Sequence, residues 1–242
     1  LRNGGYYWAV NDYLGLKFTE LVTTNGTVGA GLQAQYAWRY KFTGSLSFNY
    51  VRTRPQNPDL PNSKSTNSYR LSWTHTQAPT SMPNSSFGAS VQMQSADYYN
   101  ATLETGTARL NTTFNSSVNY GHVFAGTPFS ISVGLRHSQN LLNRTISFSL
   151  PTLHIGMSRV APFKSKIQTG KLKWYENIGI TYNFDFQNSV STYDSTLFRY
   201  STLEKFNLGI RQTVSVDAPF SLFKYMNIAP AFNYNENTYF KQ

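Results

Sequence analysis

The chain has 242 residues, and only 13% of them are charged, whereas soluble domains carry about 25%. It contains no cysteine and no run of about 18 apolar residues, which excludes disulfides, thiolate metal sites and a transmembrane helix. Its 21 lysines and arginines outnumber 11 acids, but they are dispersed rather than clustered, so we do not expect a nucleic-acid surface.

The first predicted elements alternate between apolar and polar residues with a period of two. A partial strand at 4–10 is followed by alternation over 12–22, and TTNG at 23–26 supplies a tight hairpin turn with Asn-Gly at its tip. Residues 27–40 and 42–50 repeat the alternation, and the first of these segments is longer than most soluble strands. These segments predict antiparallel strands that pair in chain order.

The rest of the chain continues the pattern. Further strands are expected at 68–76, 86–94, 111–122, 129–138, 145–158, 174–187, 205–216 and 226–238. The apolar parity switches at Pro151, and a strand bulge is the expected cause, because proline cannot donate to the ladder. About 12 strands, no convincing helix and hairpin-sized connections predict an all-β, antiparallel up-and-down meander.

The connections between these strands are of two kinds. Polar loops at 53–67, 95–110 and 188–204 would lie on one side of the sheet, and turns at 77–85, 123–128 and 159–173, which contain proline, on the other. Transmembrane β-barrels show this asymmetry between long outer loops and short periplasmic turns. Because the chain begins without Met and ends on NTYFKQ, which resembles the middle of an element, we expect residues 1–242 to be one segment of a larger barrel domain.

The two parities of each strand predict two different environments. One parity is apolar, while the other carries glycine, glutamine, serine and threonine rather than the lysine and glutamate of a soluble surface. This combination is typical of a barrel with lipid outside and a water-filled lumen, and it argues against a soluble β-sandwich, the competing fold. The lipid-facing candidates are Leu14, Leu16, Leu32 and Leu208, and an aromatic girdle is expected from Tyr36, Trp38, Tyr40 and Trp174.

Five basic residues lie on the polar parity and would project into the lumen. They are Lys17, Arg39, Arg70, Arg136 and Arg211. Such cations could meet an anionic cargo such as a phosphorylated glycolipid, because guanidinium and ammonium groups bind phosphate oxygens. The alternative is charge pairing inside the lumen, for example with Asp185, and the sequence leaves both interpretations open.

The sequence carries little sign of catalysis or metal binding. His75, His122, His137 and His154 show no HExxH or H-x-H spacing and no accompanying acidic cluster, so no metal site is expected. The chain has no GxSxG nucleophile turn, so an enzyme is not expected either.

Six segments, in order over nearly the whole chain, carry a family resemblance. They are GGYYWAVNDYLGLKF, YRLSWTHTQAPTSMPNSSFGASV, VFAGTPFSISVGLRHSQN, SFSLPTLHIGMSRVAPF, KWYENIGITYNFDF and KYMNIAPAFNYNE. Each resembles a strand-and-turn segment of the LptD family, the outer-membrane lipopolysaccharide-assembly proteins. None of them is a catalytic signature.

The resemblance implies a translocon that inserts lipopolysaccharide into the outer leaflet of the cell outer membrane. It further implies that this chain is roughly the first half of the barrel, without the periplasmic domain and the remaining strands. The implied partners are lipopolysaccharide, an LptE-type lipoprotein plug, periplasmic Lpt bridge proteins and the lipid bilayer, with no cofactor. A porin or other outer-membrane transporter for soluble solutes, or a passive surface or adhesion barrel, remains the alternative.

Overall fold

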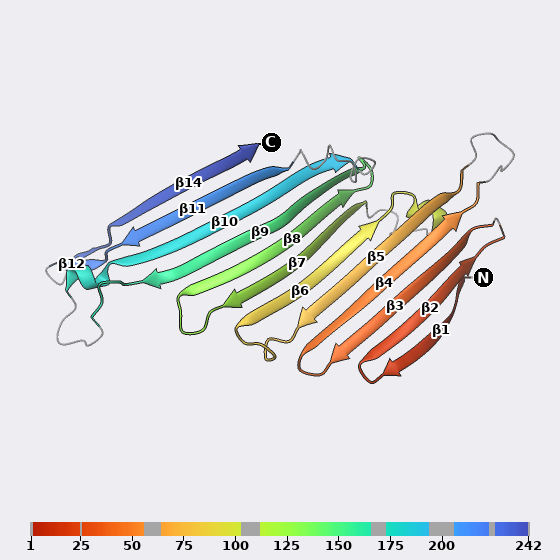
Figure 1. Cartoon of the computed structure of the whole chain (residues 1–242), viewed down its shortest axis with the longest axis horizontal. Helices are drawn as coiled ribbons and strands as arrows, with labels where there is room; N and C mark the ends of the chain where they lie inside the picture. Colours follow the sequence, from red (N-terminus) through yellow and green to blue (C-terminus); the bar gives the residue numbers. More distant parts are fainter. Residues whose placement is uncertain are drawn as a thin grey trace.

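The computed structural model describes residues 2–24, 26–55, 64–102, 112–165, 173–193, 206–222 and 226–241. Its main feature is one antiparallel sheet of 12 strands in which neighbours in sequence are neighbours in space (Figure 1). The strands are β1 (Arg2–Asn11), β2 (Leu14–Val22), β3 (Val28–Trp38), β4 (Phe42–Thr53), β5 (Thr66–Gln77), β6 (Ser85–Gln94), β7 (Thr113–Val123), β8 (Phe129–Asn140), β9 (Thr145–Val160), β10 (Gly179–Tyr193), β11 (Asn207–Asp217) and β14 (Ala231–Lys241). The predicted all-β meander is confirmed.

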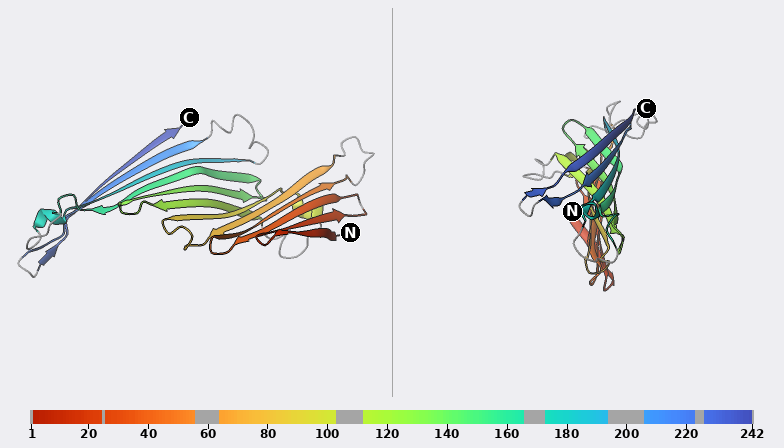
Figure 2. Two further views of the ribbon diagram at one scale, coloured as in Figure 1. Left: turned by 60° about the horizontal axis from the view of Figure 1, so that its bottom comes forward. Right: turned by 90° about the vertical axis from the view of Figure 1, so that its left-hand side faces the viewer.

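The sheet is open. Strands β1 and β14 form its two edges and lie at opposite ends of a single curved layer (Figure 2). An open meander of this kind is what a segment of a larger barrel should form, since a complete barrel has no edge strands. None of the described helices is long and apolar enough to cross a membrane.

Short turns set the strand ends. Gly26 has φ +80°, and the turn after β2 is closed by the Thr23 and Gly26 amides, which donate to the Thr27 and Thr23 carbonyls at 3.0 and 3.1 Å. At the other rim, β3 ends at Trp38 because Tyr40 has φ 63° and turns the chain into β4. The observed strand is therefore shorter than the predicted strand 27–40, whose last two residues belong to a turn.

Two short helical elements and a separate hairpin depart from the predicted meander. A short helix, α1 (Tyr98–Thr102), follows β6, and a 3-10 turn, η2 (Trp174–Asn177), occupies the start of the predicted strand 174–187. The short strands β12 (Phe220–Leu222) and β13 (Met226–Ile228) form a separate hairpin between β11 and β14. Pro230 follows β13, and its carbonyl accepts from the Ala218 amide at 3.0 Å. Predicted boundaries at 56–63, 103–111 and 194–205 lie outside the described residues.

The register of β9 changes at Pro151. On the β8 side, Gly134 pairs with Thr152 and Arg136 with Ser149, so one β8 residue faces both Leu150 and Pro151. The ladder with β10 makes the same shift, between Gln187 and Ser189. One extra residue in β9 relative to both neighbours has the pairing of a β-bulge, and it keeps apolar residues on the same face along the whole strand.

The strand register sorts the side chains onto two faces. We call the face that carries Leu32 the apolar face and the face that carries Gln33 the polar face. Leu32 lies opposite Phe18 and Phe48, whereas Gln33 lies opposite Lys17 and Ser47. Few side chains are buried because a single layer has no second layer to cover it.

The helix α1 forms a small apolar cluster on the polar face. The helix packs on β4 and β5, where Tyr98 and Ala101 contact Val51 and the half-buried Leu21. The segment after β6 thus folds back over the polar face of the first strands.

Candidate functional site

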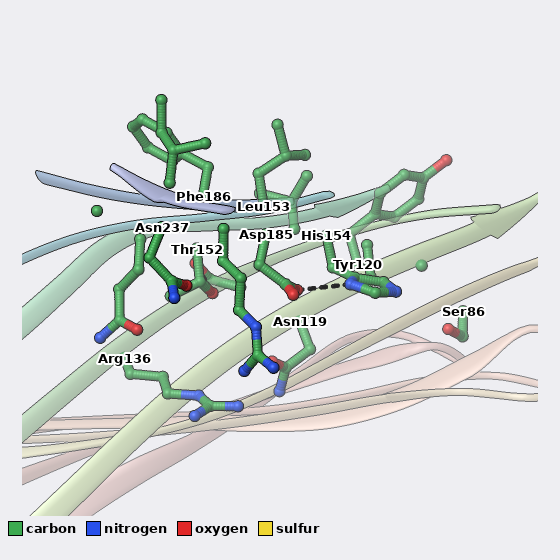
Figure 3. Close-up of a pocket in the computed structure, with 18 of the residues that line it drawn as sticks. Ser86, Asn119, Tyr120, Arg136, Thr152, Leu153, His154, Asp185, Phe186 and Asn237 are labelled. Atoms are coloured by element: carbon green, nitrogen blue, oxygen red, sulfur yellow. Dashed lines mark hydrogen bonds and ion pairs between the residues drawn. The ribbon is translucent and has the colours of Figure 1, made fainter. Parts of the chain in front are cut away.

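A row of polar side chains crosses the polar face near the C-terminal edge of the sheet. His154 of β9 lies opposite Asp185 of β10, Asp185 opposite Arg211 of β11, and Arg211 opposite Asn237 of β14. These residues line a pocket of about 620 Å3, to which β8 contributes Arg136 (Figure 3). The meander therefore brings together residues that are up to a hundred positions apart in the sequence.

His154 and Asp185 are paired within this pocket. His154 Nδ1 lies 2.7 Å from Asp185 Oδ1, and both side chains are almost half exposed (Figure 3). Beside them, the Thr152 hydroxyl donates to the Gly134 carbonyl at 3.0 Å. A Cβ at position 134 would lie 2.6 Å from that hydroxyl, so alanine there would displace the Thr152 side chain. The Asp185 carboxylate is paired with His154 and not with an arginine.

Arg136 and Arg211 face the pocket, and no described acidic side chain pairs with either of them. The polar face carries one other acid in the described strands, Asp217, whose carboxylate lies 2.7 Å from Arg159 at the rim. Within the described ranges, neither Arg136 nor Arg211 makes an ion pair, and both are exposed. A guanidinium offers five donors in a planar fork that matches phosphate and carboxylate oxygens. The pocket therefore has the chemistry of an anion-binding surface.

The other predicted cations lie elsewhere. Lys17 and Arg70 are on the polar face, but on β2 and β5, outside this pocket. Arg39 lies in the turn between β3 and β4 rather than on a strand, and its guanidinium sits 5.1 Å from the centre of the Tyr40 ring. The structure thus brings Arg136 and Arg211 together and leaves the other three apart.

The predicted lipid-facing residues share the apolar face. Leu14 and Leu16 lie opposite Tyr36 and Ala34, and Leu208 lies opposite Phe240. All three leucines and Leu32 are half-exposed, as expected for side chains with only their strand neighbours around them.

Aromatic residues gather on the apolar face near the turns. The Trp73 indole donates to the Tyr36 hydroxyl at 2.9 Å, and that hydroxyl also lies 2.9 Å from His75 Nδ1. Trp38 stacks on Tyr13 with ring centroids 4.9 Å apart. Rings that carry a polar atom, such as Tyr36 and Trp73, suit a membrane interface, where one end of the side chain is apolar and the other is hydrated.

Two members of the predicted girdle are not on strands. Tyr40 lies in the turn after β3, and Trp174 lies in η2. Both side chains are exposed. In η2 the Glu176 carboxylate accepts from the Lys173 amide at 2.7 Å, which caps the turn and prevents β10 from beginning at Trp174. Both residues remain near the same rim of the sheet as Trp38.

Sequence reasoning missed part of the site. It considered His154 as a metal ligand, a role that it rejected, and it did not single out Asn237 or Asn119, which also line the pocket. Parity after the switch at Pro151 does place His154 on the polar side, so this signal was present in the sequence. The described residues contain no group of three His, Cys, Asp or Glu side chains that could hold a metal ion.

Comparison with known proteins adds one finding. A family model described as LptD protein matches residues 1–242, the whole chain. No curated protein matches the chain.

Proposed function

Because this chain belongs to the LptD family, an outer-membrane family of lipopolysaccharide transport, we propose that it forms part of the wall of a translocon that inserts lipopolysaccharide into the outer leaflet. In this proposal the apolar face contacts lipid and the polar face lines the lumen. The translocon moves its cargo without changing it, so no catalytic residue is assigned.

The observation that carries the proposal is a pair of guanidinium groups on the polar face that form no ion pair with the residues described by the structure. Arg136 and Arg211 border one pocket, and the nearest carboxylate, on Asp185, is engaged by His154. A phosphorylated glycolipid would offer oxygens to both arginines as its headgroup passes. Lys17 and Arg70 would meet the headgroup at separate points of the same lumen.

Closure of the lumen requires more than the described strands. The backbone groups of the outer edges of β1 and β14 must find partners, since hydrocarbon offers no hydrogen bonds. We propose that further strands of the same barrel pair with both edges. An LptE-type lipoprotein inside the barrel and periplasmic Lpt bridge proteins below it would complete the route.

The test removes both guanidinium groups in the full-length protein, by Arg136→Gln with Arg211→Gln. Lipopolysaccharide should reach the cell surface several-fold more slowly at an unchanged level of folded barrel, because each charge-assisted contact is worth about 1.5–3 kcal/mol at most. The matched control, Arg39→Gln with Lys41→Gln, removes two cations from a turn outside the pocket. A porin for soluble solutes would instead show altered solute uptake with normal surface lipopolysaccharide, and this result would reject the proposal.

Orientation in the membrane can be tested with two single cysteines. Leu142, 75% exposed, lies in the β8–β9 turn, and Ala125 lies in the β7–β8 turn at the opposite rim. An impermeant thiol reagent added to intact cells should label Leu142→Cys and not Ala125→Cys, because long loops and the turns beside them face outward. Labelling of Ala125→Cys alone would invert the orientation.

A further inference from the structure

The ladder between β6 and β7 is incomplete. The two strands pair from Ser85 with His122 to Ser90 with Ser117 and then stop. Beyond this point β6 continues along β5, and β7 continues along β8, to the loop rim. The backbones of 91–94 and 113–116 are therefore not paired with one another, although both segments are strand.

Side chains take the place of the missing ladder. The Ser116 hydroxyl accepts from the Gln92 amide and donates to the Gln92 carbonyl, both at 3.0 Å. Gln139 reaches from β8, where its Nε2 donates to the Gln94 carbonyl at 2.8 Å and its Oε1 accepts from the Gln94 amide at 3.4 Å. A primary amide presents the same donor and acceptor as a peptide group, so Gln139 acts as a substitute for a strand partner.

His137 completes this arrangement, and we call Ser116, His137 and Gln139 the latch. His137 Nδ1 lies 3.1 Å from the Ser116 oxygen. Since the single Ser116 proton is donated to Gln92, the His137 Nδ1 must carry the hydrogen, which leaves Nε2 as an acceptor. All three latch side chains are buried, at 8%, 7% and 4% exposure.

The latch lies where the sequence departs from its own pattern. All three residues are on the apolar face, which otherwise carries Val118 and Tyr120 on β7 opposite Leu135 and Val133 on β8. On β7 and β8 these three polar side chains lie together beside the missing ladder. Unpaired backbone groups are strongly disfavoured in hydrocarbon, so a break in the sheet must be covered in this way.

On the polar face, the same seam opens into a second pocket of about 550 Å3. Its lining consists of Ser90, Asn115, Ser116, Ser117, Arg136, His137, Ser138, Ser147 and Ser149. Two latch residues thus border a space rich in hydroxyls with one guanidinium. Among the residues that the structure describes, the buried side-chain amide of Gln94 and His137 Nε2 have no hydrogen-bond partner.

We propose that the loop-side half of the β6–β7 seam is a side opening of the sheet, closed by the latch, that admits an amphipathic lipid with a hydroxyl- or phosphate-bearing headgroup. The headgroup would lie in the serine-lined pocket, and the acyl chains on the apolar face. Release of the latch needs only rotation of side chains, because β6 stays paired with β5 and β7 with β8. The opening lies beside the Arg211 site, with which it shares Arg136, and it goes beyond the function proposed above.

The first test asks whether the strands are apart in the membrane. In the full-length protein, a disulfide should form readily between cysteines at Ser90 and Ser117, which are paired. Cysteines at Gln92 and Asn115 would be the next partners on the polar face if the ladder continued, and they should cross-link far more slowly. Equal rates for the two pairs would overturn the proposal.

The second test removes the latch by Ser116→Ala with Gln139→Leu. Amide hydrogens of Gln92 and Gln94 should exchange at least about tenfold faster, since their acceptors are lost, while exchange in β9 stays unchanged. The matched control, Ser117→Ala with Ser138→Ala, removes hydroxyls from the neighbouring positions on the polar face. If the double variant does not fold, the single change Gln139→Ala tests the same prediction for exchange of the Gln94 amide hydrogen. Unchanged exchange in the variant would contradict the latch.

The third test identifies the lipid with a photoreactive residue at Asn115 in cells. Capture of glycolipid or of phospholipid would support the opening and name its source. A photoreactive residue at Asn237 reports on the Arg211 site in parallel. Capture at Asn237 without capture at Asn115 would overturn the side opening while leaving the proposed function intact, and capture at neither would count against both.

Discussion

The two faces of the sheet are built from alternate residues of the same strands, yet they follow different chemical rules. On β3 the apolar face carries Ala30, Leu32 and Ala34, while the polar face carries Gly31 and Gln33. A sheet with one face in bulk water would show lysine and glutamate at such positions. The difference indicates that the polar face is hydrated but enclosed, and that it carries only a few isolated charges.

The largest expected effect compares Leu32→Arg with Gln33→Arg. Arginine at Leu32 should cost about 2–4 kcal/mol if the position lies near the bilayer midplane, whereas a wet face should accept arginine at Gln33 with little loss. Urea unfolding of the full-length protein in lipid vesicles measures both. Similar losses at the two positions would contradict the assignment of the faces.

A second comparison uses two glycines. At Gly44, on the apolar face, a Cβ would overlap the Tyr36 ring and lie 2.6 Å from the Thr74 carbonyl oxygen, so Gly44→Ala should cost about 1–3 kcal/mol. At Gly88, on the polar face, the nearest atom would be 3.9 Å away. The same unfolding measurement should find Gly88→Ala almost neutral, and a larger loss there than at Gly44 would show that ring packing does not decide the difference.

The smallest effect concerns hydrogen bonding on the apolar face. Tyr36→Phe removes the acceptor of the Trp73 indole and the partner of His75, and should cost roughly 1 kcal/mol. Tyr50→Phe is the control, since its hydroxyl makes no hydrogen bond with the part of the chain that the structure describes. The fluorescence of Trp73 should shift only in the first variant. Equal stability of both variants would mean that lipid headgroups replace the lost bonds.

Much of the fold could be predicted because its cause is local. Alternation of apolar and polar residues needs no distant partner to be recognised, and the strand order follows once each connection is short. The parity switch at Pro151 revealed the extra residue of β9 for the same reason. Strand ends were less accurate, because Tyr40 and Trp174 continue the alternation while the backbone has already turned.

The candidate site was predictable only in part. Parity identified Arg136 and Arg211 as residues of the polar face, but it assigned Lys17, Arg39 and Arg70 to the same face. Register decided which cations share a pocket, because the height of a residue on a strand depends on every hairpin before it. Pairing of Asp185 with His154, rather than with an arginine, is likewise a result of register.

The sequence by itself determined the class of the protein: its strands, their two faces and its family resemblance follow from residue types at short spacing. Only the tertiary structure decided where the ladder stops between β6 and β7 and which side chains cover the gap. In the sequence, Ser116, His137 and Gln139 are three polar residues that interrupt an apolar parity. Ser116 and Gln139 bond the backbone of β6, which lies beside them in space. Because these hydrogen bonds form between neighbours in three dimensions, no spacing along the chain could reveal this role.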